Sequence, residues 1–104
     1  MDAIVVLITA PSKKEAEEIS NALIETKLIA CANVLSGIHS IFSWQGTICS
    51  EEETLLILKT KKALFVPICE AVKKMHSYRV PEIIALPIVE GSSEYLQWLD
   101  ENTK

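Results

Sequence analysis

The chain has 104 residues, of which 49% are hydrophobic, and a net charge of −4. This length fits one domain spanning residues 1–104, with enough apolar content to build a core. An acidic protein whose longest basic run is "KTKK", at residues 59–62, lacks the charge pattern of a nucleic-acid-binding protein. The apolar run at residues 3–8 is too short for a signal peptide or a membrane span. We therefore expect neither nucleic acid nor a membrane among its partners.

The three cysteines, Cys31, Cys49 and Cys69, are an odd number without CxxC spacing. This pattern predicts neither a disulfide framework nor a structural zinc site. Each cysteine has apolar neighbours in the sequence, which is typical of a small buried hydrophobe rather than a reactive thiol. We therefore expect a reducing, cytoplasmic location.

The first elements follow from apolar spacing and turn residues. Residues 3–9 are apolar on both faces, which predicts a central strand. Ser12 and Glu15 have the spacing of a capping box, so an amphipathic helix is predicted from Ser12 to about Thr26. Residues 28–60 carry β-branched and aromatic residues on both sides of "QG" at residues 45–46, which predicts a long β-hairpin.

A two-residue turn fixes the register of this hairpin. The predicted cross-strand pairs are Phe42 with Cys49, His39 with Glu52, Val34 with Ile57, and Cys31 with Thr60. Arms of this length would span roughly 50 Å, more than the width of a domain of this size, so the hairpin must bend or project. Gly37 and the acidic run at residues 51–53 are the candidate positions for a bulge. The unpaired edges of a projecting ribbon predict pairing with neighbouring subunits, and hence an oligomer.

The second half of the chain predicts a helix, a strand and a final helix. The first helix runs from residue 62 to about 76, with Pro67 close to its first turn. Its expected apolar face comprises Phe65, Cys69, Val72 and Met75. Residues 81–88 predict an edge strand, because Pro87 cannot donate to a neighbouring strand, and Ser92 can cap the last helix. The order β-α-β-β-α-β with an added C-terminal helix predicts a ferredoxin-like α+β fold, with two helices on one face of an antiparallel sheet.

The usual catalytic motifs are absent from the sequence, so we expect no enzymatic activity. His76 is the main candidate for binding, since a neutral imidazole suits Cu(II) or Zn(II) and Glu82 lies beyond the same bend. The alternative is that His76 only caps a helix C-terminus. Residue types alone leave both interpretations open.

Six segments in the same order along the chain resemble the CutA family of divalent-cation tolerance proteins. They are "TAPSKKEA", "LIACANV", "FSWQG", "LILKT", "HSYRVPEIIALPI" and "EYLQWL". The resemblance implies a cytoplasmic homotrimer that binds copper(II) or other divalent ions weakly, without catalysis. It also implies a metal site at His76 and Glu82, with Met75 as a further candidate. Some members have a cysteine and a His-His pair as copper ligands, where this chain has Ile8 and Met75-His76.

A second hypothesis belongs to another functional class. Trimeric ferredoxin-like signalling proteins of the PII type resemble this architecture. In such a protein, clefts between subunits would hold a small anionic effector or nucleotide near Lys59, Tyr78 and Trp44.

Overall fold

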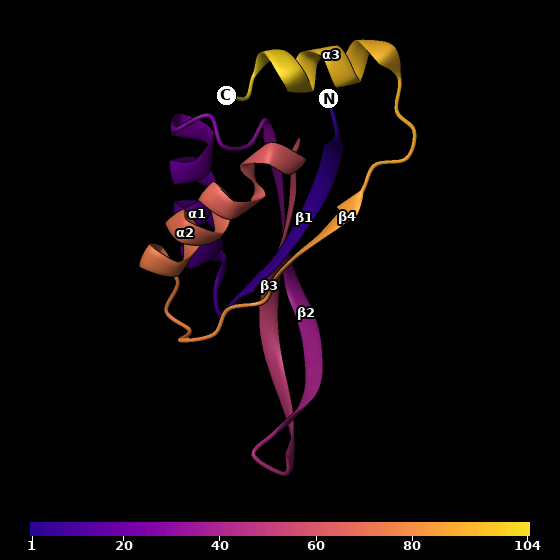
Figure 1. Ribbon diagram of the computed structural model, residues 1–104. Coiled ribbons are helices and arrows are strands. Elements are labelled where there is room, and N and C mark those ends of the chain that lie inside the picture. The colour runs from indigo at the N-terminus through magenta and orange to yellow at the C-terminus, as the bar shows by residue number, and fades with distance from the viewer.

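Four strands form one antiparallel sheet in the computed structural model, which describes residues 1–104 (Figure 1). The strands are β1 (Ala3–Ala10), β2 (Cys31–Trp44), β3 (Thr47–Lys61) and β4 (Ile83–Pro87), in the order β2-β3-β1-β4. β1 pairs with β3 on one side and β4 on the other, so the predicted central strand is confirmed. The predicted edge position of β4 is also confirmed.

Two helices, α1 (Lys13–Glu25) and α2 (Phe65–Met75), cover one face of this sheet, and α3 (Ser93–Glu101) lies across one end of it (Figure 1). The predicted β-α-β-β-α-β order with an added helix, and with it the α+β fold, is confirmed. The hydroxyl of Ser12 caps α1 by accepting a hydrogen bond from the Glu15 backbone N–H at 3.2 Å. None of the helices has the length and apolar content that crossing a membrane requires.

The prediction for α2 needs a correction. A short 3-10 helix, Lys62–Leu64, precedes α2, which begins only at Phe65. Its two fully buried residues are Ile68 and Val72, whereas Met75 keeps 38% of its surface exposed. Of the predicted apolar face, Val72 is therefore confirmed as buried and Phe65 packs against the core, whereas Ile68, one turn before Val72, takes the inner position predicted for Cys69 and Met75.

The core lies between the sheet and the two helices. Alternate residues of the central strands point into it, and the large apolar side chains that are fully buried are Val6 and Ile8 on β1 and Leu56 and Leu58 on β3. Each large apolar side chain buried in this way stabilises the fold by roughly 1.5–3 kcal/mol. Ile8 is thus a core residue.

The β2–β3 hairpin projects from this body, as predicted, and the molecule measures 45 × 26 × 22 Å (Figure 1). Its turn residues Gln45 and Gly46 have φ angles of 49° and 79°, which suit the type I′ turn favoured in tight hairpins. A bulge between Leu35 and Ile38 contains Gly37, whose φ of 78° favours glycine. Gly37, one of the two predicted bulge positions, is therefore confirmed.

The bulge divides the predicted register into a correct part and an incorrect part. On the turn side, Phe42 faces Cys49 and His39 faces Glu52, as predicted. Beyond the bulge, the extra residue in β2 shifts every pair by one position. Val34 faces Leu56 and not Ile57, and Cys31 faces Lys59 and not Thr60.

Candidate functional site at the α2–β4 bend

The bend between α2 and β4 begins where His76 ends the helix. The backbone N–H of His76 still donates to the Val72 carbonyl at 2.8 Å, but its φ and ψ of −75° and 136° are those of extended chain. Pro81 lies a few residues on and has no backbone N–H with which to continue a helix. The chain therefore turns away from the helix axis, and the His76 side chain contacts Thr9 near the end of β1.

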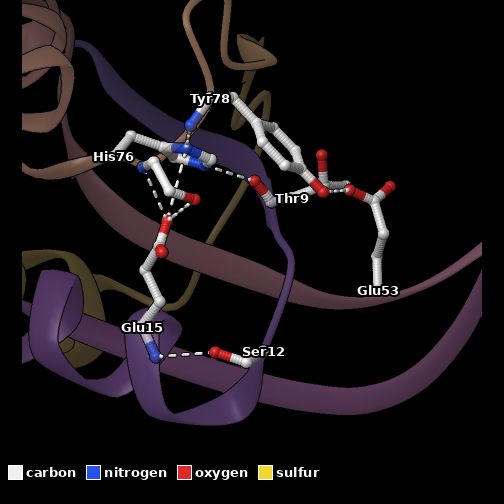
Figure 2. A network of polar contacts seen from close by, with 7 residues as sticks. Thr9, Ser12, Glu15, Glu53, His76 and Tyr78 are labelled. Carbon is white, nitrogen blue, oxygen red and sulfur yellow. Dashed lines mark hydrogen bonds and ion pairs between the residues drawn. The ribbon is translucent and has the colours of Figure 1, made fainter.

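The imidazole of His76 is fully buried and has a defined tautomer. Its Nε2 lies 2.7 Å from the backbone carbonyl oxygen of Thr9 in β1 (Figure 2). A carbonyl oxygen only accepts hydrogen bonds, so Nε2 carries the proton and donates it. In the neutral ring, Nδ1 then accepts the backbone N–H of Tyr78 at 3.0 Å. Both ring nitrogens are thus engaged within the chain.

Glu15 reaches this bend from the first turn of α1 (Figure 2). Its Oε2 accepts hydrogen bonds from the backbone N–H and from the hydroxyl of Ser77, each at 3.0 Å. The same oxygen lies 3.4 Å from Nδ1 of His76. Only the Ser12 half of the predicted capping box forms, because the Glu15 carboxylate binds the bend and not the helix end.

Tyr78 connects the bend to the hairpin. Its hydroxyl donates to Oε2 of Glu53 at 2.6 Å, and its ring centre lies 4.8 Å from that of His76 (Figure 2). Burial, together with the hydrogen bond to the Glu53 carboxylate, raises the pKa of Tyr78 well above its ordinary value. The phenol is therefore held as a proton donor. Glu53 itself is only 7% exposed and lies on β3 beside the bulge.

The predicted metal residues are placed unequally around this bend. His76 lies inside it, Met75 is partly exposed at the end of α2, and Glu82 is exposed. No hydrogen bond or ion pair joins Glu82 to His76, and no group of three or more His, Cys, Asp or Glu in the chain could hold a metal ion. The donors that do lie together are Nδ1 of His76, the carboxylate of Glu15 and the hydroxyl of Ser77.

The three residues of the predicted effector cleft do not gather in one chain. Lys59 lies opposite Cys31 at the body end of the hairpin, with its Nζ 4.0 Å from the cysteine sulfur. Trp44 lies beside the turn at the other end and is 58% exposed. Tyr78 lies beside the bulge between them. A cleft that used all three would need residues from neighbouring subunits.

Comparison with known proteins gives matches over nearly the whole chain. A family model described as "CutA1 divalent ion tolerance protein" matches residues 4–102. The divalent-cation tolerance protein CutA of Thermus thermophilus is 52% identical over 99 residues, which cover 95% of this chain and 96% of that protein. Protein CutA, chloroplastic, of Arabidopsis thaliana is 43% identical over 102 residues, which cover 98% of this chain but 56% of that protein. The crystal structure of CutA1 from Oryza sativa superposes with a TM-score of 0.98 at 41% identity, covering 100% of this chain and 95% of that one.

Proposed function

Because this chain belongs to the CutA1 family of divalent ion tolerance proteins, we propose that it binds copper(II) or another divalent cation weakly, as a homotrimer and without catalysis. The observation that carries the proposal is the fixed imidazole of His76. Metal-binding histidines usually donate their second N–H to a carboxylate or a backbone carbonyl, which orients the ring. In this chain the Thr9 carbonyl would have that role, and Nδ1 would be the coordinating atom.

Weak binding follows from what the cation would have to displace. Nδ1 already accepts the Tyr78 N–H, so part of the gain from coordination is spent on breaking that hydrogen bond. Glu82 and Met75, the ligands predicted beside His76, would join it only if the bend moved or another subunit supplied them. Ile8, at the position of a cysteine ligand in some members of the family, has no donor atom and is buried in the core.

The trimer is supported by apolar surface that a monomer would leave in water. On the projecting hairpin, Ile41, Trp44 and Ile48 are 74%, 58% and 81% exposed. On the edge strand β4, Ile84 and Leu86 are about half exposed. Open strand edges with apolar side chains are the surfaces that proteins cover by subunit pairing.

Light scattering and isothermal titration with Cu(II) test both parts of this proposal. We expect a mass of three 11.5 kDa chains, and a binding heat that is lost in His76→Ala. The matched control is His39→Ala, because His39 is the only other histidine and is exposed on the hairpin. Equal heats from wild type and His76→Ala would refute the site, and a monomer would refute the trimer.

A further inference from the structure

We propose that Lys59 on β3, with Tyr95 and Trp98 on α3, binds a small organic anion, whose acid group lies on Lys59 and whose flat ring lies against the two aromatic side chains. The inference goes beyond the proposed cation binding, since it uses no residue of the α2–β4 bend. It keeps Lys59 from the effector hypothesis, but it replaces Tyr78 and Trp44, which lie elsewhere in the chain.

Two lysines of β3 point to the same side of the sheet, and only one of them has a counter-ion. Lys61 lies 2.8 Å from the Asp100 carboxylate of α3, and its ammonium also donates to the backbone carbonyl of Lys104 at 2.8 Å. Lys59 forms no ion pair, and the only hydrogen-bond partner of its ammonium is the Cys31 sulfur, 4.0 Å from Nζ. A partly buried ammonium loses hydration that no opposite charge in the chain replaces, so Lys59 favours an anion from outside.

The groups around this ammonium can donate hydrogen bonds to an anion. Burial, and then the neighbouring Cys31 side chain, raise the pKa of Tyr95. The phenol therefore keeps its proton at neutral pH, and it lies beside the same cysteine as Lys59 does. Sulfur is only a weak acceptor, so a carboxylate or phosphate oxygen that displaces it gains stronger hydrogen bonds from both donors than those that are lost.

The aromatic pair supplies a surface for the rest of the ligand. Tyr95 and Trp98 lie one turn apart on α3, with ring centres 5.6 Å apart and ring planes inclined by 37°. They keep 40% and 43% of their surfaces exposed. Two aromatic rings that are held together and still open to solvent suit stacking with a flat ring. The ligand class is therefore an aromatic or heteroaromatic acid.

The cluster lies apart from the hairpin surface that the proposed trimer covers. The helix α3 crosses the end of the sheet opposite to the hairpin turn (Figure 1). Cys31 pairs with Lys59 at this end, whereas Trp44 pairs with Thr47 beside the turn. Pairing of the projecting hairpins between subunits therefore does not use the residues of the anion site.

Titration with three simple probes tests the inference. In a Trp44→Phe background, Trp98 is the only tryptophan of the chain, so its fluorescence reports on the site. We expect benzoate, which has a carboxylate and a ring, to change this fluorescence saturably. Benzoate should bind about tenfold or more tightly than acetate, which lacks the ring, and than benzyl alcohol, which lacks the charge. The buffer must be low in salt, because other ions screen the charge of Lys59.

Two variants and a matched control assign the residues. Lys59→Met removes the charge and should weaken benzoate binding about tenfold or more. Tyr95→Phe keeps the ring, removes the hydroxyl and should weaken binding about threefold to tenfold. Lys73→Met is the control, because Lys73 also lies near a cysteine, Cys69, but is exposed on a different helix. This control should bind benzoate like wild type.

The results separate the anion site from its alternatives. Equal benzoate affinities of wild type and Lys59→Met would overturn the site, and equal affinities of wild type for benzoate and acetate would overturn the role of the aromatic pair. Absence of binding by all three probes would also overturn the inference. If Lys59→Met then lost the trimer in light scattering, the counter-ion of Lys59 would be a carboxylate of a neighbouring subunit. The cation site at the bend has its own copper titration and stands or falls independently.

Discussion

The hydrogen bond between Tyr78 and Glu53 should stabilise the fold measurably, and Tyr78→Phe removes it. The substitution keeps the ring, with its packing against His76 at 4.8 Å, and deletes only the hydroxyl that donates to Glu53 at 2.6 Å. A hydrogen bond to a charged group contributes about 1.5–3 kcal/mol to the free energy of unfolding. Since Glu53 is only 7% exposed, water replaces the lost donor poorly. We expect a loss within that range.

Urea denaturation at one fixed protein concentration would measure this loss, because the stability of an oligomer depends on concentration. Tyr95→Phe is the matched control. A double-mutant cycle with Glu53→Ala isolates the coupling between Tyr78 and Glu53. A loss below about 0.5 kcal/mol for Tyr78→Phe, the range of ordinary surface substitutions, would refute the reasoning.

The same hydrogen bond predicts an alkaline dependence of stability. Burial and the Glu53 carboxylate raise the pKa of Tyr78 above its ordinary value of 10.0, so the folded chain holds the phenolic proton more tightly than the unfolded chain. The associated stabilisation is complete below pH 10.0 and is lost as the pH rises from there through the folded-state pKa. The stability of Tyr78→Phe should fall less steeply than that of wild type as the pH rises above 10.0. Identical dependence of stability on alkaline pH in the two proteins would contradict a raised pKa for Tyr78.

Two further predictions concern the hairpin and α3. Gly37→Ala meets no atom within 4 Å, so its cost should come from the positive φ alone, at about 1–2 kcal/mol in urea denaturation. Gly37→Asn should cost less, since asparagine tolerates this conformation better, and equal losses would contradict the backbone explanation. The Lys61 ammonium lies 2.8 Å from Asp100 and lowers the pKa of that carboxyl. The stabilisation from this ion pair is therefore present at pH values above the ordinary pKa of the carboxyl, and it is lost as the pH falls through the lowered pKa. Lys61→Met should raise the pKa of Asp100 in a carboxyl NMR titration, and an unchanged titration would exclude the ion pair in solution.

Most of the fold was predictable because local signals agree with one another. The apolar run of β1, the Ser12 cap and the "QG" turn each act within a few residues, and their order specifies the topology. The register of the hairpin was predictable only as far as Gly37. Beyond it, a single bulged residue shifted every pairing by one position, and the sequence offered two candidate positions for that bulge without choosing between them.

The candidate site was predictable only in its central residues. His76 and Tyr78 lie in one recognisable motif, whereas Glu15 and Glu53 approach them from α1 and β3. The sequence explained Glu15 through its helix cap, and Glu53 belonged to the acidic run at residues 51–53, which was interpreted only as a candidate bulge position. Neither local explanation reveals a contact made across the fold. The roles of Glu82 and Met75 as ligands stay predictions.

The central position of β1 has a consequence for how the chain folds during synthesis. β1 precedes the other strands along the chain, yet its partners follow much later: Ile4 pairs with Thr60 on one side and with Pro87 on the other. Until those residues emerge, an apolar strand with two unpaired edges is exposed to other nascent chains. The β2–β3 hairpin, whose pairing needs only its own residues, can form in the meantime and offer β3 as a template. Slow translation between β1 and β3 should therefore promote aggregation more than an equal delay placed after β4.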